Sequence, residues 1–217
     1  MKVEIWSDVV CPWCYIGKRR FEAAKAAFEE EAGDTIEVVY RPFMLDPTAP
    51  QDPLPVRAVY EKKFGGPQQA EEILERVTAE AAGEGLGFRM DIALRANTLA
   101  AHRLLVLAEQ KGCQIELKER LMAAYFTEGI DVADVDQLVD FAVEVGMDAE
   151  TARAWLEGDG GRAEVAESLE FAADNGLTSV PTYVFDRRVA LPGAQSPETF
   201  ARVLSRIAST DGPEQLS

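Results

Sequence analysis

Cysteine, histidine and positive charge are all scarce in this chain. Its 217 residues include 3 Cys and 1 His, and 22 Lys and Arg stand against 38 Asp and Glu, which gives a formal net charge of -16. A strongly negative field repels the phosphates of nucleic acids, so the composition speaks against DNA or RNA as a partner. Three cysteines are too few for a secreted scaffold built on disulfides, and an odd number leaves at least one thiol unpaired. We therefore expect cysteine to serve chemistry here rather than structure.

Long apolar runs are lacking as well. No uninterrupted apolar stretch approaches the roughly 20 residues that a membrane-spanning helix needs. The first residues, Met1 to Ile5, alternate apolar and polar side chains and show neither the basic start nor the apolar stretch of a signal peptide. Hydrophobic residues make up 47% of the chain and charged residues 28%, values typical of a globular protein. The sequence predicts a cytoplasmic protein without a membrane partner.

The two ends of the chain have the pattern of a small α/β domain. Alternation predicts a strand over 2–7, helical spacing predicts a helix over 14–31, and β-branched residues predict a second strand over 35–41. Such a unit places its two strands parallel, with a right-handed crossover. Near the C-terminus the pattern predicts short strands over 182–185 and 188–191 and a last helix over 197–208.

Between these segments the chain has helical periodicity. Five prolines within 42–55 exclude a helix interior or a central strand there. Helices are then predicted over 56–64, 68–82, 96–111, 114–127, 134–145, 148–157 and 161–174. The order predicts an α/β fold in which residues 1–55 and 176–217 form one discontinuous domain and residues 56–175 form an inserted helical domain.

Two cysteines lie where the first strand gives way to the first helix, in the run Cys11-Pro12-Trp13-Cys14. Sulfurs at i and i+3 lie on one helical face, close enough to form a disulfide. Cys11 stands at the helix N-terminus, where unpaired amides and the positive end of the helix dipole stabilise a thiolate. Cys14, one turn deeper, would then attack the mixed disulfide and release the product. Pro12 is favourable in the first helical turn, because its fixed φ angle is helical and the N–H that it lacks would have no partner there.

Two other interpretations of this pair are open from the residues alone. The cysteines could be a buried structural pair, or they could supply half of a zinc site. Zinc needs two more ligands, and Cys113 and His102 are the only thiol and imidazole left in the chain. Their spacing is not that of a zinc finger or ribbon. A C-x-x-C after the first strand of such a unit favours redox chemistry.

A second feature precedes the returning strands, where Val180-Pro181 leads into the strand over 182–185. A proline at a strand start removes a hydrogen-bond donor, so it belongs at an edge or at a cis turn. Most X-Pro bonds are trans, and an ordinary trans turn is the alternative.

Together these features resemble the DsbA family of thioredoxin-fold oxidoreductases, and more narrowly its FrnE-like branch. The likeness covers most of residues 2–205. Its motifs are the run from Ser7 to Gly17, Asn97-Thr98, Ala101-His102-Arg103, the run from Tyr125 to Gly129, and Gly193-Ala194-Gln195. The resemblance implies a thioredoxin-like fold carrying a large helical insertion.

The resemblance also implies roles for single residues. Cys11 would be the exposed nucleophile, Cys14 the buried resolving thiol, and Pro181 a cis-proline packed against the disulfide. The backbone of Val180 would pair with an extended substrate, with Pro12 and Trp13 nearby. Two departures matter: the oxidising periplasmic members carry His in place of Trp13, and some FrnE-like proteins have a second, C-terminal cysteine pair that this chain lacks.

Four further predictions concern residues around the motif. His102 is expected to be a semi-buried histidine or to line the active-site cleft and bind substrate. Asp8 is expected to cap the turn before the helix, or to carry protons to and from a thiol. Trp13, exposed at its position, is expected to touch substrate or to pack on the helical segment. Residues 18–20, Lys-Arg-Arg, are expected to be a solvated helix face, or to help stabilise the thiolate through their charge.

Three functions fit these residues. The first is a thiol–disulfide oxidoreductase, favoured in the reductase or isomerase direction, acting on protein or small-molecule thiols and disulfides without a cofactor or metal, with glutathione as a candidate co-substrate. The second is a glutathione-dependent transferase or isomerase of the kappa or chromene carboxylate isomerase type, although those usually keep a Ser and lack the second cysteine. The third is a zinc or binding module. Cys113 is expected to be a free structural thiol, and a homodimer through the insertion is a candidate assembly.

Overall fold

A four-stranded mixed sheet lies at the centre of the molecule, which we describe from a computed structural model covering residues 1–49 and 53–210. The strand order is β2-β1-β5-β6. β1 (Lys2–Ser7) pairs in parallel with β2 (Glu37–Pro42), and the remaining neighbours, β5 (Thr182–Phe185) and β6 (Val189–Pro192), pair antiparallel. This confirms the parallel strand–helix–strand unit. The predicted α/β domain also includes residues 50–52 and 211–217, which lie outside the described residues.

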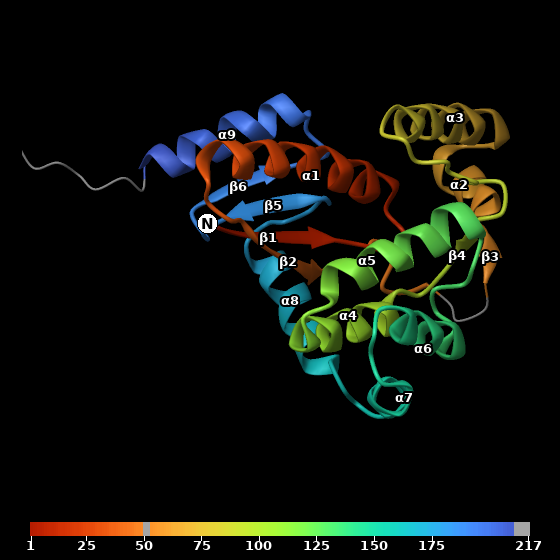
Figure 1. The fold of residues 1–217 in the computed structure, drawn as a ribbon. Coiled ribbons are helices and arrows are strands. Elements are labelled where there is room, and N and C mark those ends of the chain that lie inside the picture. Colours follow the sequence, from red (N-terminus) through yellow and green to blue (C-terminus); the bar gives the residue numbers. More distant parts are fainter. Residues whose placement is uncertain (50–52, 211–217) are drawn as a thin grey trace, which may run out of the picture.

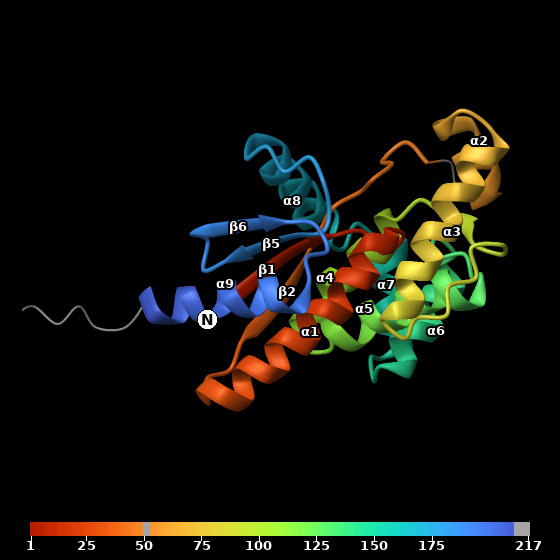
Figure 2. The same ribbon diagram turned by 90° about the horizontal axis from the view of Figure 1, so that it is seen from above.

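One face of the sheet is covered by α1 (Pro12–Ala32) and α9 (Pro197–Thr210), as Figures 1 and 2 show. Alternate residues of β1, Val3 and Ile5, point into this layer and pack with Phe21 of α1 and Phe200 of α9. Because side chains alternate across a strand, Trp6 points to the opposite face and joins a different core. The apolar residues on one face of α1 are therefore buried against the sheet and α9.

The other face is covered by α4 (Leu99–Lys111), α5 (Gln114–Ala123) and α8 (Arg162–Asp174) of the helical segment (Figure 1). Trp6 stacks on Phe171 of α8 with ring centroids 5.3 Å apart. At the sheet edge, the Tyr40 N–H donates to Gln114 Oε1 (2.8 Å) and Gln114 Nε2 donates to the Tyr40 carbonyl (3.0 Å). The helical segment thus supplies hydrogen-bond partners to an edge strand that would otherwise be unpaired.

The rest of the helical segment consists of α2 (Val56–Phe64), α3 (Pro67–Gly83), α6 (Val135–Glu144) and α7 (Ala149–Glu157). Every predicted helix is confirmed to within a few residues. The helix predicted over 114–127 instead ends as an α-helix at Ala123 and continues as a π-helical turn over Ala124–Glu128. There the Thr127 hydroxyl donates to the Ala123 carbonyl (2.6 Å), and this contact accompanies the widened turn.

Two differences from the predicted elements have local causes. The helix predicted from residue 96 begins at Leu99, because the Leu99 N–H donates to the Asn97 side chain (3.1 Å) and this turn holds the preceding residues out of the helix. A two-residue antiparallel pair, β3 (Leu54–Pro55) with β4 (Leu94–Arg95), was not predicted. Strands of two residues are too short to show alternation.

The larger hydrophobic core combines residues of the helical segment with Cys11 and Cys14 at the start of α1. The α/β fold with a helical insertion is therefore confirmed, and the insertion packs directly around the cysteine pair. Among the described residues, no helix has the length and apolar character needed to cross a bilayer.

Candidate active site

The two cysteines of the C-x-x-C motif lie at the start of α1, directly after β1 and a short turn. Cys11 is the N-cap residue of α1, and Pro12 follows at the first helical position. The Cys14 N–H donates to the Cys11 carbonyl (3.0 Å), so the two residues share the first helical turn. Both are free thiols. The strand end, the proline and the helix start thus bring the sulfurs together as the spacing predicted.

Cys11 is buried, which corrects the expectation of an exposed nucleophile. Only 4% of its surface is accessible, against 2% for Cys14. The Cys11 thiol donates to the Val180 carbonyl at 3.7 Å, and Val180 itself is buried. The helical segment contributes to the same core through Tyr125 and the partly buried Tyr60. The sequence pattern did not reveal this cover because it comes from residues far away along the chain.

The protonation of the pair also differs from the expected thiolate at Cys11. The hydrogen bond with Cys14, followed by burial, raises the pKa of Cys11 well above its ordinary value. Burial also opposes ionisation of Cys14, but the hydrogen bond from Cys11 and the charge of Lys118 outweigh it and lower the pKa of Cys14. Of the two thiols, Cys14 therefore has the lower pKa.

The Val180-Pro181 turn lies against this pair, at the start of β5. Its peptide bond is cis. The Gly193 N–H donates to the Pro181 carbonyl (2.7 Å), and the Thr182 hydroxyl donates to the Ser179 carbonyl (2.8 Å). Two sequence features 169 positions apart are thus brought into contact through Cys11 and Val180. That Val180 pairs with substrate stays a prediction.

Gly17 gives α1 the room to lie against this turn. A Cβ atom there would lie 2.7 Å from Tyr183 Oη and 3.1 Å from Pro181 Cγ. We expect Gly17→Ala to lower the free energy of unfolding by about 1–3 kcal/mol, because the overpacked turn must shift. Gly83→Ala is the control, since no atom of residues 1–49 and 53–210 lies within 4 Å of the added Cβ. Urea unfolding measures both, and equal stability of the two variants would contradict the close packing at Gly17.

Asp8 and His102 form a buried pair beside the cysteines. Asp8 Oδ1 lies 3.2 Å from His102 Nε2, and the Leu45 N–H donates to Asp8 Oδ2 (2.8 Å). Burial opposes ionisation of Asp8, but its contacts with His102 and Leu45 outweigh it and lower the pKa of this carboxyl. The predicted cap by the Asp8 side chain is wrong, because the side chain turns to His102 and only the Asp8 carbonyl accepts the Cys11 N–H (3.3 Å).

His102 is fully buried, at 1% exposure, and not semi-buried as expected. Its partner Asp8 comes from the loop after β1, a contact that helical periodicity does not predict. Contact of His102 with substrate, and proton transfer by Asp8, stay predictions.

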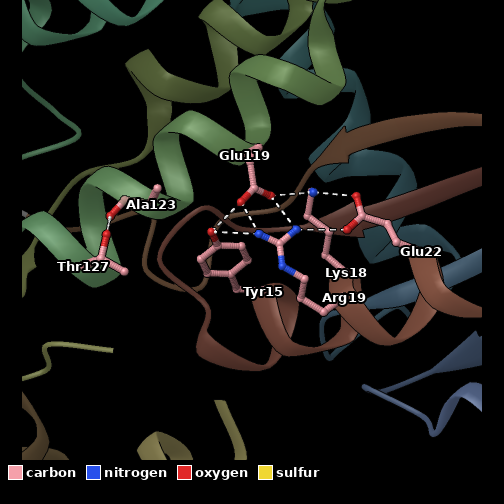
Figure 3. Close-up of polar contacts among 7 residues, drawn as sticks. All are labelled: Tyr15, Lys18, Arg19, Glu22, Glu119, Ala123 and Thr127. Carbon is pink, nitrogen blue, oxygen red and sulfur yellow. Dashed lines mark hydrogen bonds and ion pairs between the residues drawn. The ribbon is translucent and has the colours of Figure 1, made fainter. Parts of the chain in front are cut away.

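The basic residues after the motif were predicted to be solvated, and this is wrong for Lys18, which is 3% exposed. Figure 3 shows Glu119 of α5 between Tyr15 and Arg19 on one side and Lys18 on the other. Tyr15 Oη and Lys18 Nζ each donate to Glu119 at 2.6 Å, and Arg19 completes the cluster. Arg20, also partly buried, binds Glu80 and Glu84 of the α3 region. Glu22 of α1 itself pairs with Lys18 and Arg19, but the other acids on this face come from the helical segment, which the sequence of α1 alone does not reveal.

Trp13 and Pro12, both predicted to contact substrate, differ in exposure. Trp13 is 37% exposed, as its position suggested, whereas Pro12 is buried.

Cys113 is a half-buried free thiol at the N-cap of α5. Within residues 1–49 and 53–210, no group of three or more His, Cys, Asp or Glu side chains is arranged to hold a metal ion.

Sequence reasoning missed two residues at this site, Ser7 and Lys118. Lys118 lies in α5 and is completely buried behind the cysteines, and Ser7 is the last residue of β1. A signal was present for Lys118, because it follows Leu117 and precedes Leu121 on the buried face of a predicted helix. A lysine in that position predicts a buried charge.

Comparison with known proteins supports the family inferred from these features. The family model of the DsbA-like thioredoxin domain matches residues 2–205. The chain belongs to this family. The crystal structure of a probable DsbA oxidoreductase from Streptomyces coelicolor is 39% identical, with a TM-score of 0.91 over 100% of this chain and 94% of that one. The predicted thioredoxin-like fold is thereby confirmed, while the narrower FrnE-like likeness stays a prediction.

Two more distant structures share the fold. The cytosolic disulfide reductase DsbM from Pseudomonas aeruginosa, in a structure with glutathione, is 18% identical, with a TM-score of 0.68 over 96% of this chain and 100% of that one. A 2-hydroxychromene-2-carboxylate isomerase is 14% identical, with a TM-score of 0.67 over 97% of this chain and 98% of that one. Such identities show a common fold alone, and this fold serves both disulfide exchange and isomerisation.

Proposed function

We propose that this member of the DsbA-like family is a thiol–disulfide oxidoreductase that works through Cys11 and Cys14. The observation that carries the proposal is the arrangement of two free thiols on one helical turn, with Cys11 at the helix N-cap and in contact with the Val180 carbonyl. Disulfide exchange needs two neighbouring thiols of unequal acidity. The raised pKa of Cys11 and the lowered pKa of Cys14 supply that difference.

Exchange would proceed in two steps. In the form of the pair that carries one proton, this proton passes from Cys11 to Cys14. The Cys11 thiolate attacks one sulfur of the substrate disulfide, forms a mixed disulfide and expels the other sulfur as a thiolate. Cys14 then passes its proton to the expelled sulfur, attacks Cys11 and releases the second substrate sulfur as a thiolate. The substrate disulfide gains two electrons and the Cys11–Cys14 pair loses two; the one proton of the pair ends on one substrate sulfur, and the other sulfur takes a proton from solvent.

The Val180 carbonyl is suited to hold the substrate during the first step. In the structure the Cys11 thiol lies within hydrogen-bonding distance of this carbonyl (3.7 Å) as well as of the Cys14 sulfur, and its one proton can serve only one of them at a time. Once Cys11 is bonded to substrate it carries no proton, and the carbonyl becomes free to accept a backbone N–H from an extended substrate. Trp13, exposed at the same helix end, would add an apolar contact.

We propose the reductase or isomerase direction, with glutathione or a similar thiol restoring the dithiol, in the cytoplasm. Known pairs range from about -270 mV in thioredoxin to about -120 mV in DsbA. Trp13 replaces the His of the oxidising members, which favours a more reducing pair. The shared fold of the isomerase makes glutathione-dependent isomerisation the second candidate, although Cys14 has no use in it.

A turnover assay separates the two candidates. The protein is mixed with glutathione and a peptide carrying one disulfide, and the release of peptide thiols is followed. We expect catalysed release that ceases when Cys11 is alkylated. Glutathione binding without any catalysed release would contradict disulfide exchange and favour the isomerase candidate.

A further inference from the structure

Lys118 is a buried ammonium group with almost no partners. It is 0% exposed. Among the residues that the structure describes, its Nζ has a long contact to the Ser7 carbonyl (3.5 Å) and lies over the Tyr40 ring, 5.4 Å from the centroid. An ammonium group has three hydrogens to donate, and burying one without an acceptor is costly. A lysine kept in such a place indicates that an acceptor forms there during function.

Ser7 presents a second unused donor at the same place. Its side-chain oxygen is buried and has no hydrogen-bond partner among the described residues. Buried hydroxyl groups are normally hydrogen-bonded, so this one requires an explanation. Ser7 comes from β1 and Lys118 from α5 of the insertion, so two elements direct free donors to one position.

Cys14 is the group that both donors favour when it ionises. The charge of Lys118 and the Ser7 hydroxyl each lower the pKa of Cys14. The Cys14 sulfur is almost completely buried, so water cannot stabilise its charge. Donors fixed in place before charge develops stabilise an anion without any cost of reorganisation.

We propose that Ser7 and Lys118 form a preorganised site for the Cys14 thiolate, and that the helical insertion thereby completes the exchange machinery. The inference rests on the proposed function. It matters most in the mixed disulfide, where Cys11 is bonded to substrate and can no longer donate its proton to Cys14. Ser7 and Lys118, together with the Asp8 backbone, are then left to stabilise the charge on the attacking sulfur.

The contacts of Glu119, the next residue on α5, fix the position of the helix that carries Lys118. Glu119 binds Tyr15, Lys18 and Arg19 of α1, and this cluster holds α5 against the helix that carries the cysteines (Figure 3). The helix that carries Lys118 therefore has a fixed position relative to the helix that carries Cys14. A charge held in place is worth more than a mobile one, because no side-chain entropy is lost when the thiolate forms.

The benefit should depend on pH. Burial lowers the pKa of Lys118 to about 8, against the opposing effects of nearby acidic groups. The ammonium is thus charged at pH 7 and supports the thiolate there, and the support fades as the pH rises through 8. The other titratable groups that act on the pair of Lys118 and Cys14 are Asp8, Cys11, Lys18, Tyr40 and Tyr183.

The test is the pKa of Cys14 in protein that carries Cys11→Ala, followed by ultraviolet absorbance of the thiolate. Removing Cys11 also removes its hydrogen bond, as in the mixed disulfide. We expect Lys118→Met to raise this pKa by about 1–2 units, which means roughly 10- to 100-fold less thiolate at neutral pH. Ser7→Ala should raise it by about half a unit to one unit. Lys111→Met, an exposed lysine at the end of α4, is the control and should leave it unchanged.

Folding does not confound this test. Ser7→Ala removes a hydroxyl that has no hydrogen-bond partner in the part of the chain that the structure describes, so we expect no loss of stability. Even if Lys118→Met failed to fold, the Ser7 variant would decide the question. An unchanged Cys14 pKa in Ser7→Ala and in any folded Lys118→Met protein would overturn the inference. Because the titration needs no turnover, a raised pKa in a protein without exchange activity would refute the proposed function alone.

Discussion

Cys14→Ser is expected to stop turnover at the mixed disulfide, whereas Cys11→Ser is expected to stop it before any covalent step. With serine at 14, Cys11 can still attack a disulfide, but no second thiol lies on the same helical turn to release the product. We expect turnover to fall at least about a thousandfold in both variants, the scale at which enzymes lose activity without a covalent nucleophile. Only the Cys14 variant should accumulate protein bonded to substrate.

Mass spectrometry of each variant after mixing with a disulfide peptide distinguishes these outcomes. The Cys14 variant should gain the mass of one peptide, bound to Cys11 through a disulfide, and the Cys11 variant should gain no mass. Cys113→Ser is the matched control, because this third thiol is half buried and belongs to another helix start, and it should retain full turnover. An adduct on Cys14 in the Cys11 variant would show that the assignment of the two sulfurs is reversed.

The largest effect on stability is expected at Arg103, which is buried in α4. Its guanidinium donates at 2.6–3.0 Å to the carbonyl oxygens of Trp155, Leu156, Gly158 and Gly160. The Trp155 indole N–H donates back to the Arg103 carbonyl (2.9 Å). One side chain therefore pairs the carbonyl groups at the C-terminal end of α7, which have no partner within the helix.

Arg103→Met should leave these carbonyl groups without donors, in a position that is buried at Leu156 and part-buried at the other three. Each such group costs about 1–3 kcal/mol, and because some of them will reach water we expect a total loss of roughly 3–5 kcal/mol in the free energy of unfolding. Denaturant unfolding followed by circular dichroism measures the loss. Arg162→Met, an exposed arginine one turn from the same corner, should change stability by less than about 0.5 kcal/mol. Similar values for the two variants would show that the carbonyl contacts contribute little.

The sequence allowed the order of elements to be predicted because local patterns determine it. Alternation in β1 and helical spacing in α1 reflect the two faces that each element buries. What the sequence did not show was which distant side chains meet. The sequence around Lys18 predicted a solvated side chain. Its ion pair with Glu119 forms only because α5 packs on α1. Local periodicity carries no information about such partners.

For the same reason, one part of the candidate site could be predicted from the sequence and another part could not. The C-x-x-C pair follows from spacing within one helical turn, which is a local property. The burial of Cys11, the pairing of Asp8 with His102 and the approach of Lys118 all depend on how the insertion folds back over the sheet. A buried charge within an apolar helix face is the one sequence signal that would have pointed to Lys118.

The most direct test of the proposed exchange is a redox titration of the intact protein. It is equilibrated in buffers of varied glutathione poise, the remaining free thiols are alkylated, and the protein is weighed by mass spectrometry. We predict that two thiols are lost together in a single two-electron transition, with Cys113 still free, and that the midpoint lies nearer to about -270 mV than to about -120 mV. Loss of one thiol at a time, with glutathione retained on the protein, would contradict dithiol exchange by Cys11 and Cys14.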